Sequence, residues 1–341
     1  MNLRELSEKL GLSQTTVSRA LNGYPEVSEA TRQKVIAAAD AHNYQPDARA
    51  RSLATGRAKA IGHIIPRSTK NEMVNVVFAD FIAGAGETYS RFGYDMVLSM
   101  VADDDEEQAY RTLARKRNVD GVVVHAPSRN DPRIDLLREL NLPFVVHGRS
   151  SQVTSDYNWL DVNNRRAIER ATDFLLDLGH QRIALINGLE RMDFALRRRE
   201  GYVAALARKG IAEDTALMRS SEMTEPYGYN SAQQMLNAAH PPTAFIASSI
   251  VVAMGIRRAI EERGGVMGRD VSVICYDDVI SYFPNGDGEP IFTATRSSVR
   301  AAGLRCGEIL LNQIEDPERA AVHELWETEL VVGASTGPAP V

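Results

Sequence analysis

The sequence predicts an α/β protein in which an N-terminal helix-turn-helix head precedes a larger, two-lobed core of the doubly wound type. Two observations lead to this prediction. Residues 1–45 contain no β-rich run, and their apolar side chains recur with helical spacing. From about residue 60, short runs rich in Val and Ile alternate with longer stretches of helical spacing. This alternation is typical of parallel strands that are buried on both faces and connected by helices.

The head, residues 1–45, is predicted to contain three short helices. Leu3, Leu6 and Leu10 share one face of the first helix, which ends at Gly11, a common C-terminal stop. Serines precede the second and third helices and are suited to cap them; they are Ser13 and Ser28. A tight turn between the first two helices makes the unit a helix-turn-helix.

Residues 46–59 join the head to the core and allow two interpretations. The simpler one is a plain linker that follows the helix-stopping Pro46. Flexible linkers favour Gly and Ser, however, whereas the stretch RARSLA at 49–54 is a reasonable helix former. A hinge that is helical only in some states of the protein fits this composition better.

The core, residues 60–341, is predicted to form two lobes because its strands fall into two successive sets of βαβ units. The chain is expected to cross between the lobes near residues 158–164, and a late strand at 291–298 to return to the first lobe. Lobe 1 is thus predicted at about 60–159 and 293–324, and lobe 2 at about 160–292 and 325–336. The other expected strands are 60–66, 94–101, 119–127, 142–149, 181–188, 243–249 and 271–278.

Composition narrows the class of protein. No apolar run approaches the roughly 20 residues of a membrane-spanning helix, and the N-terminus has no apolar signal-peptide core. The two cysteines, Cys275 and Cys306, lie far apart without a CxxC motif, which argues against a disulfide framework or a zinc site. We therefore expect a cytoplasmic protein with no membrane partner.

Charge is distributed unevenly along the chain. Residues 1–59 carry nine Lys and Arg against six Asp and Glu, whereas the remaining residues carry 30 against 39. A basic segment on an acidic body is compatible with a head that binds nucleic acid.

Enzyme signatures are poor. The seven histidines are scattered without metal-binding spacing, and no nucleophile elbow or phosphate-binding loop occurs. Asp277 and Asp278 are adjacent on a predicted strand, so that their side chains point to opposite faces and are badly placed to share a proton. We expect no catalytic residues, no metal and no cofactor.

A ligand-binding cleft is better supported, because ligands of open α/β sheets lie beyond the carboxyl ends of the strands. Those ends and one loop-helix segment collect hydroxyl, imidazole, guanidinium and carboxylate groups, which suit the hydroxyls of a small sugar. Phe78 and Tyr276 can supply apolar faces for a sugar ring. The polar candidates are His147, Arg149, Arg198, Ser248, Ser249, Asp277 and Asp278.

The outer face of the second helix, quoted as SQTTVSRALNG (13–23), carries groups that can read a DNA major groove. Arg19 can pair bidentately with guanine and Gln14 with adenine, while Thr15 and Ser18 are more permissive. Hydroxyls and amides near helix N-termini commonly bind phosphates; the candidates are Thr16, Asn22 and Ser28.

The whole chain resembles the lactose-repressor/galactose-repressor (LacI–GalR) family of transcription regulators. The resemblance rests on GLSQTTVSRALNG, VSEATRQKV and NYQPDARARSL in the head and hinge, and on LGHQRIALING, RRREGYVAAL and DVSVICYDD in the core. It implies a helix-turn-helix head, a hinge helix formed on operator binding, and a core similar to periplasmic sugar-binding proteins. It also implies a dimer that binds near-palindromic DNA.

The resemblance assigns roles to single positions. Gln14 and Thr15 fall at the variable base-reading positions and Arg19 at the common arginine. Leu53 falls at the hinge leucine that wedges into the minor groove, with Ala50 as its small partner, and such a wedge costs a few kcal/mol of base unstacking. In the core, the resemblance assigns the sugar-binding positions to Arg198 and Asp277.

Two departures from the family pattern alter the expected pocket. The strand TAFIA is followed by Ser249 and Ile250 where an Asn-Asp or Ser-Asp pair is usual, and the strand LPFVV is followed by His147, Gly148 and Arg149 where an Asp is frequent. Taken together, the head, the hinge and the cleft residues support a homodimeric repressor whose effector is a mono- or disaccharide. A purine-like or phosphosugar corepressor, a solute-binding protein with an unrelated head and, last, a sugar-processing enzyme remain the alternatives.

Overall fold

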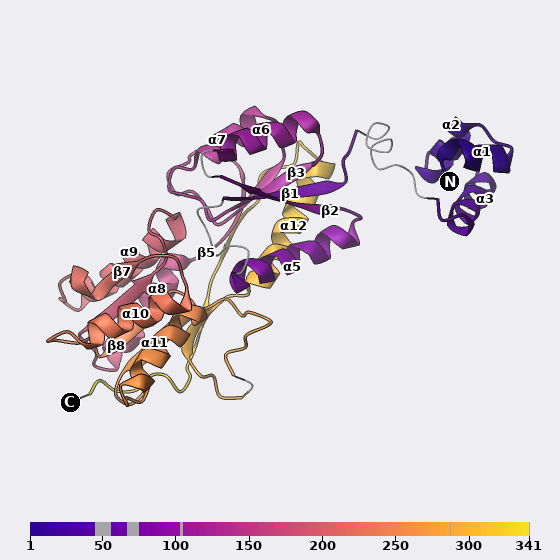
Figure 1. Ribbon diagram of the computed structural model, residues 1–341. Helices are drawn as coiled ribbons and strands as arrows, with labels where there is room; N and C mark the ends of the chain where they lie inside the picture. The colour runs from indigo at the N-terminus through magenta and orange to yellow at the C-terminus, as the bar shows by residue number, and fades with distance from the viewer. Residues whose placement is uncertain (45–55, 67–74, 103–104, 287, 341) are drawn as a thin grey trace.

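The computed structural model describes residues 1–44, 56–66, 75–102, 105–286 and 288–340. It contains a three-helix head and two lobes, each built on a six-stranded sheet (Figure 1). The predicted hinge residues Ala50 and Leu53 lie outside the described residues. None of the helices in the described ranges is long and apolar enough to cross a membrane.

The head consists of α1 (Leu3–Leu10), α2 (Gln14–Leu21) and α3 (Glu29–Ala41). The predicted caps are confirmed, since Ser13 accepts a hydrogen bond from the backbone N–H of Thr16 and Ser28 one from that of Thr31. Gly11 ends α1 with φ at 63°, a left-handed conformation that glycine adopts without strain. The small head core contains Leu6, Val17, Ala20, Val27, Val35 and Ala39.

The first lobe has a parallel sheet of strand order β11-β5-β4-β3-β1-β2. Helices α5 (Val76–Arg91) and α12 (Val299–Glu315) cover one face, and α6 (Glu106–Lys116) and α7 (Pro132–Glu139) cover the other. The strands are β1 (Ala60–Pro66), β2 (Asp95–Val101), β3 (Gly121–His125), β4 (Phe144–His147), β5 (Asn158–Val162) and β11 (His323–Trp326).

The second lobe has the strand order β12-β10-β9-β8-β6-β7, in which only β12 pairs antiparallel to its neighbour. Helices α8 (Asn164–Asp177) and α9 (Asp193–Arg208) pack on one face, and α10 (Glu225–Leu236) and α11 (Ile250–Glu262) on the other. A short 3₁₀ helix, η3 (Thr215–Leu217), precedes β7. The strands are β6 (Ile183–Asn187), β7 (Met218–Ser220), β8 (Ala244–Ala247), β9 (Ser272–Asp277), β10 (Thr293–Arg296) and β12 (Glu329–Val331).

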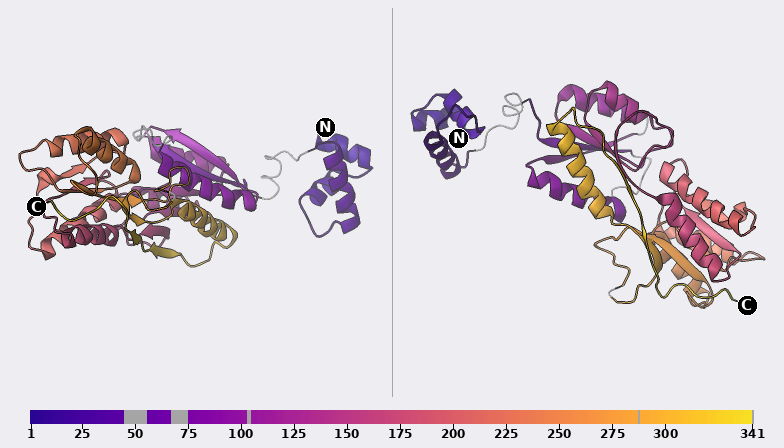
Figure 2. Two further views of the ribbon diagram at one scale, coloured as in Figure 1. Left: turned by 90° about the horizontal axis from the view of Figure 1, so that it is seen from below. Right: turned by 180° about the vertical axis from the view of Figure 1, so that it is seen from behind.

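The chain passes between the lobes three times: from β5 to α8, from β10 to α12, and from β11 to β12. The expectation that residues 291–298 return to the first lobe is wrong. Strand β10 pairs in parallel with β9 and antiparallel with β12, so its backbone hydrogen bonds belong to the second sheet. The chain returns only with α12, which lies beside α5 on the first lobe (Figure 2).

Helices α5 and α12 cross at very short distance. A Cβ atom added to Gly84 would lie 2.0 Å from the backbone oxygen of Arg300, and one added to Gly303 would lie 2.1 Å from that of Phe81. Glycine at both positions allows the two backbones to touch and fixes α12, which comes directly from the second lobe, on the first.

Candidate functional site

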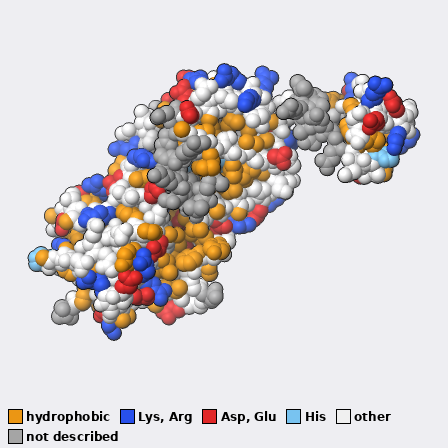
Figure 3. Space-filling view, viewed as in Figure 1, with side chains coloured by type: hydrophobic (Ala, Val, Ile, Leu, Met, Phe, Trp, Pro, Cys, Tyr) orange, Lys and Arg blue, Asp and Glu red, His pale blue; other side chains and the backbone are white. Residues whose placement is uncertain are grey.

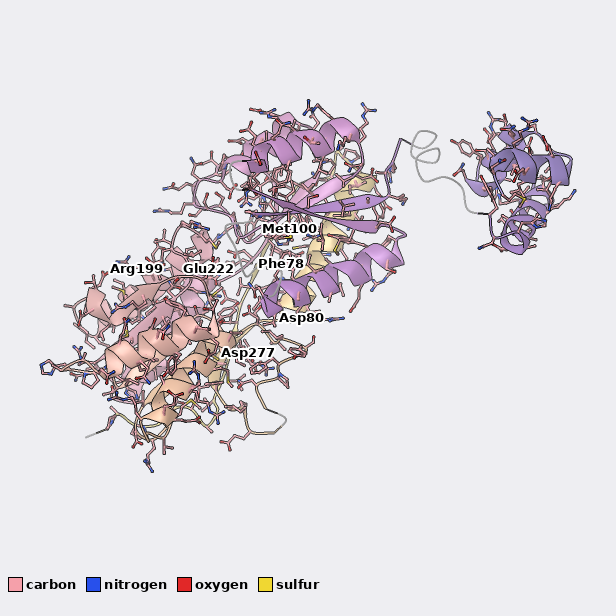
Figure 4. The ribbon with its side chains drawn as sticks, viewed as in Figure 1. Phe78, Asp80, Met100, Arg199, Glu222 and Asp277 are labelled. Atoms are coloured by element: carbon pink, nitrogen blue, oxygen red, sulfur yellow. The ribbon has the colours of Figure 1, made fainter. Side chains whose placement is uncertain are left out.

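A cavity of about 680 Å³ lies between the lobes and is lined by side chains of both. Its volume is in the range of about 300–1,000 Å³ that is usual for small-molecule sites. Of the nine candidates selected from the sequence for the ligand cleft, seven line it: Phe78, His147, Arg149, Arg198, Ser248, Tyr276 and Asp278. Phe78 belongs to the first turn of α5, at the level where the two lobes meet (Figure 4).

Ser249 and Asp277 do not line the cavity, and their neighbours Ser248 and Asp278 do. Ser249 caps α11 by accepting a hydrogen bond from the backbone N–H of Val252. The carboxylate of Asp277, at the end of β9 (Figure 4), accepts a hydrogen bond from the N–H of Val279. Since side chains alternate along an extended chain, Tyr276 and Asp278 share the cavity face and Asp277 points away from it.

Arg198 is held in one orientation at the second-lobe side of the cavity. Its Nε donates to Asn164 Oδ1 at 2.8 Å and its Nη1 donates to the backbone oxygen of Ser248 at 2.7 Å. Its guanidinium carbon lies 3.8 Å from the ring centroid of Tyr276 and 5.0 Å from that of Phe194. A planar cation fixed by two hydrogen bonds and two rings is prepared to meet a ligand without losing much side-chain entropy.

Asp278 is a carboxyl group of the second lobe that lines the cavity and can accept hydrogen bonds from a ligand. Burial raises its pKa to about 7, the Arg198 guanidinium opposes this increase, and the neighbouring Asp277 carboxylate adds to it. The group therefore exchanges between acid and carboxylate near neutral pH.

The first lobe contributes an aromatic wall to the cavity. The rings of Phe81 and His147 stack with centroids 4.3 Å apart, and His125 meets the edges of Phe78 and Phe81 at 5.1 and 4.9 Å. Burial lowers the pKa of His147 to about 4 and that of His125 well below its usual value, so both rings are neutral at pH 7. Sequence analysis did not select Phe81 or His125, although His125 lies near the carboxyl end of the strand predicted at 119–127 and ends the observed strand β3.

Arg149 is engaged in a buried ionic network at the crossing between the lobes. Its Nε lies 3.3 Å from Oδ2 of Asp161, the same oxygen that accepts a hydrogen bond from Arg197 Nη1 at 2.6 Å. Arg197 Nε in turn lies 2.9 Å from Oδ2 of Asp193. The charge of Arg149 is thus balanced within the protein.

Polar contacts join the lobes on two sides of the structure. On one side, Asp80 of α5 accepts hydrogen bonds from the N–H and hydroxyl of Ser281, at 2.9 and 3.1 Å. On the other, the Ser151 hydroxyl donates to the Asp193 carboxylate at 2.6 Å, and the Asp193 N–H donates to the backbone oxygen of Pro127. The angle between the lobes is therefore maintained by specific hydrogen bonds.

The head presents a second candidate site on α2. Gln14, Thr15 and Arg19 are exposed, and Arg19 has no ion pair with any residue that the structure describes. Val17 and Ala20, on the opposite face, are buried in the head core. The exposed face is therefore free to bind a partner while the buried face holds the helix.

The remaining predicted DNA contacts also have local structural roles. The Thr16 hydroxyl bonds to that of Ser13 at 2.8 Å, and the Asn22 amide donates to the backbone oxygen of Ser18 at 2.9 Å. Ser28 is exposed and caps α3. Within the described ranges, no three His, Cys, Asp or Glu side chains are grouped to hold a metal ion.

Two family models match the chain. Residues 2–47 match the bacterial regulatory proteins of the lacI family, and residues 58–286 match the periplasmic binding proteins and sugar-binding domain of the LacI family. The chain belongs to the LacI family. It is therefore a DNA-binding transcriptional regulator with a helix-turn-helix head and a periplasmic-binding-protein-like core, as the sequence predicted, and its relatives are regulators rather than enzymes.

Relatives of this LacI-family regulator align over most of its length. The regulator AglR of Rhizobium meliloti is 46% identical over 344 residues, covering 100% of this chain and 95% of that protein. RafR of Escherichia coli is 32% identical over 280 residues, covering 81% of this chain and 82% of that protein.

Two solved structures are similar over nearly the full chain at 26% identity. The lac repressor dimer bound to operator and the anti-inducer ONPF has a TM-score of 0.84, covering 99% of both chains. The CelR–cellobiose complex has a TM-score of 0.72, covering 98% of this chain and 99% of that one. By this measure the chain as a whole is more similar to the lac repressor than to CelR.

Proposed function

We propose that this LacI-family regulator is a homodimeric repressor that binds a near-palindromic operator and loses affinity for it when a neutral mono- or disaccharide enters the cavity between the lobes. The observation that carries the proposal is the cavity itself, in which a fixed guanidinium, a carboxyl group and an aromatic wall face one another. This combination suits a ligand with hydroxyl groups on the edge of a ring and C–H groups on its faces.

The charges around the cavity favour a neutral ligand over a phosphosugar. Six carboxyl groups and four arginines line it. Arg149 is paired with Asp161, and the lining residue Arg133 is paired with Asp131 and Glu106. A phosphate would meet an excess of negative charge and would have to displace existing partners, which is costly in a partly buried site.

Two relatives point to different effectors. CelR has been solved with cellobiose, which supports a saccharide. PurR of Photobacterium profundum is 30% identical over 340 residues, covering 98% of both chains, and the aromatic wall could also stack on a flat heterocycle. A purine-like corepressor is therefore the second candidate, and the effector screen below separates the two.

For operator recognition, Gln14, Thr15 and Arg19 would contact base edges in the major groove, with Thr16, Ser18, Asn22 and Ser28 near the backbone phosphates. Leu53 and Ala50 would enter the minor groove at the centre of the operator. Two heads related by a two-fold axis match a palindromic site. An effector changes operator affinity only if it binds the two lobe arrangements with different affinity. Each ~1.4 kcal/mol of that difference shifts the equilibrium between the arrangements tenfold.

An exposed apolar surface supports dimerisation. Phe92, Leu98 and Met100 are 48%, 42% and 53% exposed, and hydrophobic side chains gather on the face of the first lobe that carries α5 and β2 (Figure 3). Patches of this kind commonly mark protein interfaces. Analytical ultracentrifugation should find a dimer at micromolar concentration, and a monomer there would contradict this part of the proposal.

The operator proposal is tested by selecting duplexes from a random library and measuring affinity for the selected sequence. Arg19→Ala should weaken that binding about tenfold or more, because a bidentate base contact contributes about 1–3 kcal/mol of discrimination. Arg4→Ala is the matched control, since Arg4 is an exposed arginine of the head that pairs with Glu8. An equal loss of operator affinity in both variants would show that Arg19 contributes only its positive charge and contacts no base.

The effector proposal is tested by thermal-shift screening of the full chain against neutral sugars, phosphosugars and purines, because a ligand of the native state raises the melting temperature. Neutral sugars should stabilise the wild type but not Arg198→Ala. Stabilisation by purines alone would replace the saccharide with the second candidate.

A further inference from the structure

Behind the aromatic wall, a chain of hydrogen bonds runs from a buried tyrosine to the cavity. The hydroxyl of Tyr89, on α5, lies 3.2 Å from Nε2 of His63, on β1. Nδ1 of His63 lies 3.0 Å from Nε2 of His125, at the end of β3. Tyr89 and His63 are 1% and 0% exposed, whereas His125 lines the cavity.

The ring geometry fits hydrogen bonding between the two imidazoles. Their planes differ by only 21° and their centroids are 5.3 Å apart, so the N–H of one ring can point at the nitrogen lone pair of the other. Burial lowers the pKa of His63 to about 3, and both rings are neutral. Each neutral ring has one N–H donor and one acceptor nitrogen, so the chain has only two possible polarities.

In the first polarity, the Tyr89 hydroxyl donates to His63, His63 donates to His125, and the remaining N–H of His125 is at Nδ1. In the second, His125 donates to His63, His63 donates to the tyrosine oxygen, and the tyrosine hydrogen needs another acceptor. No hydrogen bond from the Tyr89 hydroxyl to another group of the described residues is found. A buried hydroxyl left without an acceptor costs free energy, so the first polarity is favoured.

The exposed end of the chain is Nδ1 of His125. This nitrogen has no hydrogen-bond partner among the described residues, and it is not one of their buried unpartnered polar atoms. Its surroundings are the rings of Phe78, Phe81 and His147. The site is therefore a single oriented donor in an aromatic setting.

We propose that Tyr89, acting through His63, fixes His125 as a hydrogen-bond donor at Nδ1, which binds an acceptor oxygen of the effector, such as a hydroxyl, ring or glycosidic oxygen. The inference rests on the proposed function in that a ligand occupies the cavity. Tyr89 and His63 are positioning residues, and His125 touches the ligand. His147 differs, because no hydrogen bond within the described residues sets its tautomer.

The polarity is tested without any ligand, by ¹⁵N NMR of the histidine rings in the full-length protein at neutral pH. His63 and His125 should both carry their proton on Nδ1, the less common tautomer of neutral imidazole, and Tyr89→Phe should shift His125 towards the Nε2 form. Wild-type His125 protonated on Nε2 would overturn the proposal. Tyr202→Phe is the matched control, because Tyr202 is equally buried and bonds the Ile183 oxygen in the second lobe; it should leave both tautomers unchanged.

The ligand contact is tested by calorimetry with the sugar found in the thermal screen. His125→Phe should reduce affinity tenfold or more and Tyr89→Phe several-fold, while operator affinity without sugar stays unchanged in both. Wild-type sugar affinity in His125→Phe would overturn this inference and leave the proposed function standing. If no sugar stabilises the protein, the proposed effector class fails, and the NMR result still decides the polarity.

Discussion

Asp278 and Arg198 face the same cavity from neighbouring elements and carry opposite charges, yet only the arginine is fixed by protein partners. The protonation of the Asp278 carboxyl group therefore depends on its surroundings in the cavity. The histidines of the aromatic wall and of the chain behind it are held neutral by burial, with the pKa of His147 at about 4 and that of His63 at about 3. Asp278, with its pKa at about 7, is therefore the lining residue expected to control pH dependence near neutrality.

We predict that sugar affinity increases between pH 6 and pH 8, several-fold, because an ionised carboxylate accepts hydrogen bonds from hydroxyls more strongly than a carboxylic acid does. Asp278→Asn should bind more weakly and show an almost flat profile. Calorimetric titration of both proteins at several pH values tests this. A slope retained in the variant would assign the dependence to another group.

The same shift has a consequence for stability in the absence of ligand. The folded pKa of Asp278 is above its usual 3.8, so the folded state binds the proton more tightly than the unfolded state does. The contribution of this group to stability therefore decreases as pH rises from about 4 to about 7. Between about pH 4 and about pH 7, the melting temperature of the wild type should therefore fall relative to that of Asp278→Asn, which thermal melts of both proteins measure.

At the residue scale, one general rule located several lining residues of the cavity from the sequence. The rule that ligands lie beyond the carboxyl ends of parallel strands selected the lining residues His147, Arg149, Ser248 and Asp278. A neighbouring loop-helix segment added Arg198, to which the family resemblance also pointed. The rule also collected Ser249 and Asp277, which do not line the cavity, because sequence does not fix which of two adjacent side chains faces the cavity where a strand ends. The tautomers of His63 and His125 depend on a tyrosine from another element and have no sequence signal.

At the level of elements, the crossing of α5 and α12 connects the two lobes, because α12 follows strand β10 of the second lobe and packs on α5 of the first. The two glycines there, Gly84 and Gly303, allow backbone contact that no other residue permits. Gly86, in the same helix, is different: a Cβ added to it would meet its nearest neighbour, a Met96 methyl group, at 3.6 Å.

We predict that Gly84→Ala lowers the melting temperature by several degrees, because the new methyl group collides with the Arg300 backbone and separates the helices. Gly86→Ala should be neutral or stabilise by up to about 1 kcal/mol, the usual gain of alanine over glycine in a helix. Thermal melts of both variants provide the comparison. Equal melting temperatures would show that α12 can shift without cost.

Three of the four strands that sequence analysis missed share a physical reason, and the fourth, β5, lies beside one of them. Strands β7, β11 and β12 are three or four residues long and lie at sheet edges or next to the lobe crossing, and β5, β11 and β12 contain acidic residues. Edge strands bury only part of their surface, so they lack the continuous apolar runs that identified the central strands. Strand β10 was recognised but assigned to the wrong sheet, since periodicity predicts a strand without naming its neighbours.

At the scale of the whole molecule, the angle between the lobes is what an effector must change. Asp80 contributes to that angle by bonding Ser281 of the second lobe, and it also lies 3.2 Å from the Arg300 guanidinium on α12. We propose that the described arrangement of the lobes is the one that binds DNA, and the Asp80–Ser281 contact stabilises that arrangement.

We predict that Asp80→Ala weakens operator binding several-fold and lowers the sugar concentration needed for half-release, since it removes a contact that we assign to the DNA-binding arrangement. Glu87→Ala is the matched control, because Glu87 lies on the same helix and pairs with the same Arg300, and within the described residues no hydrogen bond or ion pair joins it to the second lobe. Release assays by fluorescence anisotropy measure both effects. An identical response of the two variants would remove the Asp80–Ser281 contact from the switch.

The threefold passage of the chain between the lobes limits how this protein can be rebuilt. The head is joined to the core by one covalent connection, so a chimaera that exchanges residues 1–44 for the head of another regulator needs a single junction. A graft of one lobe would need three junctions, placed after β5, after β10 and between β11 and β12. New operator specificity is therefore the accessible target of recombination, while a new effector specificity has to come from point substitutions within the cavity.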